Sequence, residues 1–204
     1  MQYPAVPATE EPGASALAIA THGSQHDPLR QAIRMLDTAS ASRHPSAMCE
    51  ALTDLARCLA LQHAYPEAEA YLGQALHWAR QMPQAADLGA DLLCALAEVA
   101  CNEADLIEAQ ADDSRASRSR RVQARARAGN WAHQAAEVAR HTSDPQWEVA
   151  LLLRASDVLS RGGDLDDAAQ MQTRAQTLIE IAEARRTESP IPGAHLMRAP
   201  SALM

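Results

Sequence analysis

A short pattern recurs four times along this 204-residue chain and constrains its fold more than any other feature. Each copy has a small or polar residue, a hydrophobic residue two places later and, in most copies, an acidic residue and an alanine just after it. This order is typical of a turn between two helices followed by the start of the second helix. The copies begin at His63, Ala104, Gly129 and Gly163. Their repetition predicts a helical array rather than a single compact enzyme fold.

The composition favours an all-α chain and argues against some classes of partner. The chain is rich in alanine, and its 18 basic residues are all arginines. Both residue types form helices readily. We interpret the bias mainly as the mark of a GC-rich genome, which indicates a bacterial source. The net charge of −8 makes nucleic acid and anionic membranes unfavourable partners, because binding to either needs excess positive charge.

The absence of targeting signals and the cysteine spacing both predict a soluble, cytoplasmic protein. No basic residue precedes the short apolar stretch near the start, so no signal peptide is expected. No apolar run has the length of a membrane span. The cysteines form no CxxC pair, which disfavours a zinc site or a thioredoxin-type site. We expect Cys49, Cys58, Cys94 and Cys101 to be small, mostly buried side chains.

Proline- and glycine-rich ends frame the predicted domain. Residues 1–26 and 187–204 are expected to be flexible tails, with the helical repeat domain over 27–186. Between 105 and 128 two interpretations stay open: a break at Asp112–Ser114, or one long helix. Apolar spacing and turn residues predict helices over 28–40, 46–62, 66–82, 83–101, 131–140, 145–162 and 166–186.

The first and fourth copies resemble the tetratricopeptide repeat, a helix–turn–helix of about 34 residues. Large and small residues stand at the family's positions in 49–82 and again in 149–182. The second and third copies match weakly. The resemblance covers 46–185 and implies a right-handed superhelical array of antiparallel helix hairpins, an α-solenoid. The matching residues are Leu52, Leu55, Ala56, Leu59, Ala68, Leu72 and Ala75, and then Leu152, Ala155, Ser156, Leu159, Ala168 and Ala175.

The resemblance also implies where a partner would bind. In this family the first helix of each repeat lines a concave groove. The family's carboxylate clamp for chaperone tails is missing, because Thr53, Arg57 and Asp157 are the wrong residue types. The implied groove residues are Glu50, Thr53, Arg57, Cys94, Glu98, Leu153, Asp157 and Arg161.

The middle of the chain switches from acidic to basic. Residues 103–113 contain five acidic residues and no basic one, whereas 114–128 contain six arginines and no acidic residue. A guanidinium suits carboxylate or phosphate groups, so this segment is a candidate docking patch for an acidic peptide or another anionic ligand. The alternative is a solvated helix face whose charge the preceding acidic helix balances. The patch residues are Arg115, Arg118, Arg121 and Arg125.

No sequence motif indicates an enzyme, a cofactor or a metal site. The chain has no glycine-rich phosphate loop, no GxSxG motif and no HExxH motif. His22 and His26 are four residues apart, but Gly23 and the predicted tail disfavour a helical metal pair. For His133 and His141 we expect no acidic third ligand nearby.

These observations predict a non-catalytic adaptor that binds a protein or peptide in a concave groove. One alternative is a secretion-type chaperone with a similar fold. Another is a regulatory sensor that binds an anionic ligand through the arginine-rich segment. Self-association stays open as well, because an uncapped end of a helical array can pair with a second copy.

Overall fold

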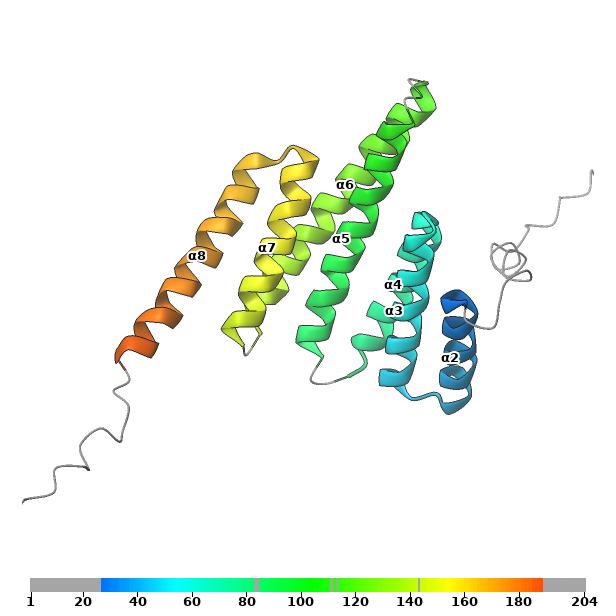
Figure 1. Ribbon diagram of the computed structural model, residues 1–204, viewed down its shortest axis with the longest axis horizontal. Coiled ribbons are helices and arrows are strands. Elements are labelled where there is room, and N and C mark those ends of the chain that lie inside the picture. The colour runs from blue at the N-terminus through cyan, green and yellow to red at the C-terminus, as the bar shows by residue number, and fades with distance from the viewer. Residues whose placement is uncertain (1–26, 83–84, 111, 113, 143, 189–204) are drawn as a thin grey trace, which may run out of the picture. The chain divides into compact units, whose positions relative to one another are not determined.

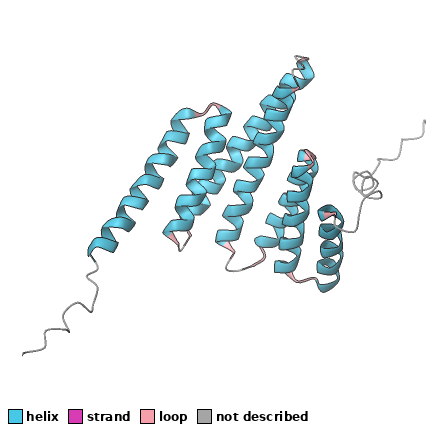
Figure 2. Ribbon diagram, viewed as in Figure 1, coloured by secondary structure: helices cyan, strands magenta, loops and turns pink. Residues whose placement is uncertain are grey.

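The computed structural model describes residues 27–82, 85–110, 112, 114–142 and 144–188, and these residues form seven α-helices and no strand. The all-α prediction is therefore confirmed for the described part of the chain (Figure 2). None of these helices is both long enough and apolar enough to cross a membrane. The chain divides into two compact units, residues 1–83 and 84–204. The predicted N-terminal tail, 1–26, and residues 189–204 of the predicted C-terminal tail lie outside the described residues.

Unit 1 contains three helices, α2 (Pro28–Ser42), α3 (Pro45–Leu61) and α4 (Tyr65–Ala79). α3 packs against both α2 and α4. Asp27 caps α2 by accepting a hydrogen bond from the Leu29 amide at 3.0 Å, and Pro28 occupies the first turn, as the sequence predicts. Apolar side chains at helical spacing on the three helices form its core, among them Leu52, Leu55, Leu59, Leu72 and Leu76.

Unit 2 consists of two helix hairpins, α5 (Ala86–Ala109) with α6 (Arg115–Ala139), and α7 (Pro145–Gly162) with α8 (Leu165–Glu188) (Figure 1). Each helix packs on the next in the chain, and α5 also contacts α7. α8 continues to Glu188, two residues into the segment 187–204 that was predicted to form the C-terminal tail.

The core of unit 2 is built largely from small side chains. Small residues let helix backbones approach closely, because no bulky group separates them. α6 contributes Ala128, Ala132 and Ala136 to one buried cluster, in which larger side chains come from α7. The rest of that cluster is Ala97, Ala100, Cys101, Leu152, Ala155, Val158, Leu159, Ala168 and Ala175.

Two of the four predicted turns do not exist. Ala104 lies inside α5, which continues to Ala109, and Gly129 lies inside α6. The predicted helix end at 101 and the predicted short helix at 131–140 are therefore wrong, as is the single helix over 105–128. The chain does break where the other interpretation placed it, because Ser114 caps α6 by accepting from the Ser117 amide at 3.1 Å.

The error at Gly129 has a simple physical cause. A glycine inside a helix costs only about 1 kcal/mol relative to alanine. Buried alanines continue through it at helical spacing, at Ala124, Ala128, Ala132 and Ala139. The packing of this stripe outweighs the local preference for a helix end, so a single helix forms where the sequence suggested two.

Candidate functional site: the α5–α7 face

The first helices of the two hairpins of unit 2 lie side by side and carry a ladder of ion pairs between them. We call this surface the α5–α7 face. On α5, Asp91, Glu98 and Asp105 stand seven residues apart, so they share one side of the helix. On α7, Arg154 and Arg161 are also seven apart and face those carboxylates.

Arg154 forms the first rung of the ladder. Its Nε donates to Glu98 Oε1 at 2.6 Å and its Nη2 to Glu98 Oε2 at 3.2 Å, while Nη1 donates to Asp91. The guanidinium fork thus engages one carboxylate at two points, which fixes its direction as well as its distance. Although burial alone would lower it, these hydrogen bonds raise the pKa of Arg154, so the guanidinium stays charged. The rung ties α7 firmly to α5.

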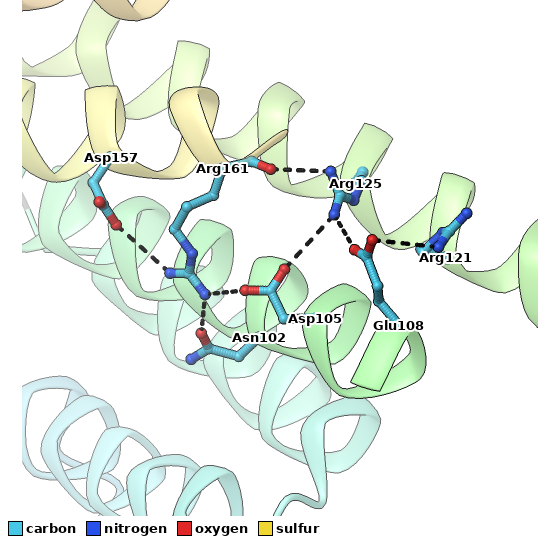
Figure 3. A network of polar contacts seen from close by, with 7 residues as sticks. All are labelled: Asn102, Asp105, Glu108, Arg121, Arg125, Asp157 and Arg161. Atoms are coloured by element: carbon cyan, nitrogen blue, oxygen red, sulfur yellow. Dashed lines mark hydrogen bonds and ion pairs between the residues drawn. The ribbon is translucent and has the colours of Figure 1, made fainter. Parts of the chain in front are cut away.

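Arg161 forms the second rung, seven residues further along α7 (Figure 3). Its Nη2 donates to Asp105 Oδ2 at 2.6 Å and to Asn102 Oδ1 at 2.7 Å. Asp157, one turn earlier on α7, lies 3.6 Å from Nη1. Asp105 is also 3.9 Å from Arg125 of α6, so the rung continues onto a third helix.

Arg125 closes the network at the C-terminal end of α7. Its Nη1 donates to the carbonyl of Arg161 at 3.0 Å and its Nη2 to Glu108 Oε2 at 2.5 Å. Glu108 also lies 3.6 Å from Arg121 (Figure 3). A helix C-terminus carries partial negative charge, so a guanidinium at this carbonyl is favourably placed.

Two large apolar side chains of α7 remain exposed to solvent. Leu153 is 47% exposed and Trp147 is 39% exposed. Leu153 directly precedes Arg154 in the chain, and Trp147 stands two helical turns before it. Aromatic and arginine side chains are enriched at surfaces that bind another chain, and Trp147 and Arg154 stand on this helix.

The structure brings four of the predicted groove residues onto this face and separates the others. Glu98, Leu153, Asp157 and Arg161 lie on it. Cys94 does not face solvent: it is 1% exposed, and its thiol donates to the Leu151 carbonyl at 3.7 Å. Placing Cys94 in an open groove is therefore wrong, because its turn of α5 packs directly against α7.

The groove residues predicted in the first copy belong to α3 of unit 1. Glu50 is exposed. The Thr53 hydroxyl donates to the Cys49 carbonyl at 2.7 Å, within its own helix. Arg57 is exposed and pairs with Asp54 at 2.9 Å. Each of the last two is engaged locally, on its own helix.

The predicted basic patch is divided by its environment. Arg121 and Arg125 are half-buried and pair with Glu108 of α5, which supports the interpretation that the acidic helix balances this charge. Arg115 and Arg118 are exposed near the start of α6. Because Arg125 is level with the end of α7, residues 115–124 extend about 15 Å beyond it.

Sequence reasoning missed Arg154, Asp91 and Asp105, which form most of the ladder. Their signal is the seven-residue spacing, which occurs in the carboxylates of 91–105 and again in the arginines of 154–161. The expectation of no acidic group near His133 is also wrong, since Asp164 and Asp167 approach its ring.

No family model matches this chain, and no curated protein matches it either. Among solved structures, a chain described as a DHF58 filament is 20% identical, with a TM-score of 0.38, over 79% of this chain and 82% of its own. The protein BtubC (BKLC) from P. vanneervenii is 14% identical, with a TM-score of 0.31, over 90% of this chain and 99% of its own. At these scores the likeness establishes neither a fold family nor a function.

Proposed function

We propose that this protein is a non-catalytic interaction module that binds a segment of another protein across the α5–α7 face. The helix hairpins would act as a divergent tetratricopeptide-like array with a right-handed superhelical course. In such an array the first helices of successive hairpins form the binding surface, and α5 and α7 are the first helices of the two hairpins of unit 2.

The observation that carries this proposal is the exposure of Leu153 and Trp147 beside a fixed polar ladder. Covering such side chains removes apolar area from water, at about 25 cal/mol per Å². The ion pairs of Arg154 and Arg161 hold the neighbouring side chains in place before binding. A surface that is already ordered loses less conformational entropy when a partner docks.

The charges of the face indicate what kind of segment would fit. Four carboxylates accompany the two guanidiniums of the ladder, those of Asp91, Glu98, Asp105 and Asp157. The surplus of negative charge favours a partner segment with basic residues. An apolar residue in that segment would contact Leu153. The partner expected is thus a basic, partly apolar peptide segment of another protein.

Co-purification from the source organism, followed by mass spectrometry, tests this function. The Leu153→Glu variant, used as the bait, should lose a partner that the wild-type protein retains. The matched control is Leu61→Glu, because Leu61 is 77% exposed but lies at the end of α3 in unit 1. A partner held equally by wild type, Leu61→Glu and Leu153→Glu would rule out the α5–α7 face.

The identity of the captured partner separates the two roles open to such a module. A signalling or regulatory protein supports the adaptor, whereas a secreted substrate supports a secretion-type chaperone. Binding of synthetic peptides from the captured partner then measures the contribution of the face. If Leu153→Glu weakens the binding of both the peptide and the intact partner, the contact lies on this face.

A second candidate function, binding of an anionic ligand, rests on the projecting part of α6. Arg115 and Arg118 are exposed there, beyond the end of α7. Changing Arg118 to Glu should abolish binding of an acidic peptide, whereas changing Arg121, which is paired with Glu108, should weaken it far less. Equal effects of the two changes would contradict a site at the projecting end.

A further inference from the structure

Three potential metal ligands converge where the start of α8 meets α6. His133 projects from the C-terminal half of α6, Asp164 lies in the turn between α7 and α8, and Asp167 lies in the first turn of α8. The His133 Nε2 atom is 3.3 Å from Asp167 Oδ2 and 4.0 Å from Asp164 Oδ2. The three ligand atoms lie within 4.8 Å of one another.

These separations are close to those of a metal site. A tetrahedral zinc ion has nitrogen and oxygen ligands at about 2.0–2.1 Å, which places neighbouring ligand atoms about 3.3 Å apart. The imidazole–Asp167 distance already has this value. The Asp164 carboxylate would have to move closer to the imidazole, and its side chain is 51% exposed, which leaves it room to rotate.

The site has room for further ligands on both sides. A pocket of about 350 Å³ is lined by His133 and Asp164, with Val158 and Leu159 among its other residues. A second pocket of about 240 Å³ is lined by His133 and Asp167, with Leu152 and Met171 among its other residues. A metal held by three protein atoms would keep at least one position facing these pockets, open to water or to a small ligand.

The positive charges that border the pockets do not oppose a cation. Three arginines line them, and each is engaged with a carboxylate of its own. Arg125 pairs with Glu108, Arg140 with Glu137 at 3.2 Å, and Arg174 with the buried Glu148. The carboxylates of Asp164 and Asp167 are therefore left to His133 and to whatever ion binds there.

From this convergence we propose that His133, Asp164 and Asp167 form a binding site for a divalent transition metal of the zinc class. One imidazole nitrogen with two carboxylate oxygens suits Zn²⁺, whereas Mg²⁺ and Ca²⁺ prefer oxygen ligands alone. The site is separate from the ladder of the α5–α7 face. A metal there would cross-link the start of α8 to the C-terminal half of α6 and so stabilise the packing of the C-terminal hairpin of unit 2.

Calorimetric titration of the untagged, chelator-treated full chain with Zn²⁺ alone tests the site. The wild-type protein should bind one more Zn²⁺ per chain than His133→Ala, or bind it at least about tenfold more tightly. Asp164→Asn and Asp167→Asn should each weaken the same binding step. Asparagine keeps the shape of aspartate and its tendency to begin a helix, so both variants should fold, which far-UV circular dichroism verifies.

His141→Ala is the matched control, since His141 is an exposed histidine just beyond the end of the same helix. It should bind Zn²⁺ as the wild type does. A His22→Ala, His26→Ala double variant removes the two histidines that stand four residues apart in the sequence, and it should also bind Zn²⁺ as the wild type does. Identical Zn²⁺ titrations for wild type and His133→Ala would overturn the proposal and leave the cluster as an ordinary contact between a histidine and two aspartates.

The thermal midpoint gives a second readout that depends on the folded site. Zn²⁺ binding to the native state alone raises the midpoint, and excess chelator should reverse the rise. The rise should be present in wild type and His141→Ala and absent in His133→Ala. An equal rise in all three proteins would place the bound metal elsewhere and contradict the assignment.

Discussion

His63 and Gly163 occupy equivalent places in two hairpins and adopt the same left-handed backbone, with φ of 61° and 92°. Each accepts this conformation to end a helix in the same hydrogen-bond pattern. The amide after it bonds to the carbonyl of Leu59 at 3.0 Å in one turn and to that of Leu159 at 2.9 Å in the other. The α3–α4 and α7–α8 hairpins therefore share the same turn geometry, although the two positions are 100 residues apart.

Replacing Gly163 or Gly129 of unit 2 by alanine should have opposite effects on the free energy of unfolding, because only Gly163 has a left-handed backbone. Gly163→Ala should lower the free energy of unfolding by about 1 kcal/mol, because an L-residue is strained at this φ. Gly129→Ala should raise it by about 0.5–1 kcal/mol, since Gly129 is in a helix interior and the new Cβ would lie an ordinary 3.8 Å from Leu159. Urea denaturation followed by circular dichroism measures both. A destabilised Gly129→Ala would support a turn at that position instead.

The equivalent alanines of the two hairpins predict a packing effect. Ala68 is fully buried and Ala168 nearly so, each in the first turn of the second helix of its hairpin. A leucine at either position would overpack the core and lower the free energy of unfolding by about 1–3 kcal/mol. Ala150→Leu, on the exposed side of α7, is the control and should change it by less than about 0.5 kcal/mol. An unchanged thermal midpoint in Ala168→Leu would contradict the close packing.

The two-point pair between Arg154 and Glu98 should contribute measurably to stability. Arg154→Ala leaves Glu98 and Asp91 half-buried without their partner, and we expect a loss of about 1–2 kcal/mol after allowance for solvent screening. Arg140→Ala is the control, because its pair with Glu137 is local and exposed, and should cost less than about 0.5 kcal/mol. Thermal unfolding at low and high salt compares the two variants. Equal losses would show that the ladder does not tie α7 to α5.

Cys94 predicts a dependence of stability on alkaline pH. Burial, partly offset by Arg154, raises the pKa of its thiol from 9.0 to about 12. The unfolded thiol ionises near pH 9 while the native thiol does not, so this contribution is fully present below pH 9 and is lost between pH 9 and 12. At pH 10 the loss is about 1 kcal/mol. Comparing wild type with Cys94→Ala at pH 7 and pH 10 isolates this loss, and an unchanged difference would exclude it.

The arrangement in space decided the middle of the chain. The pattern that recurs four times predicted helix boundaries at 104 and 129. Buried small residues on both sides of Gly129 instead kept α6 continuous. A weak local signal for a turn cannot compete with a stripe of side chains on a helix that packs against both α5 and α7. The result is one long hairpin between the two regular ones, where the sequence indicated two irregular repeats.

The candidate site was predictable in part. Helical spacing alone relates Leu153, Asp157 and Arg161, which lie on α7, whereas the packing of α7 on α5 brings Glu98 to Arg154 beside them. Cys94 was misplaced, since its burial depends on how closely α5 approaches α7. The charge balance at 103–127 needed the packing of α5 against α6, which brings Glu108 opposite Arg121 and Arg125.

The sequence by itself determined the all-α class, the N-cap at Asp27 and the two turns at His63 and Gly163, because these depend on residues close together in the chain. Only the tertiary structure decided which arginine meets which carboxylate, and that His133 meets Asp164 and Asp167. The contacts of Arg154 and Arg161 with α5, and those of His133 with the two aspartates, join residues more than 30 positions apart. They depend on which helix faces pack together, and no local pattern encodes that.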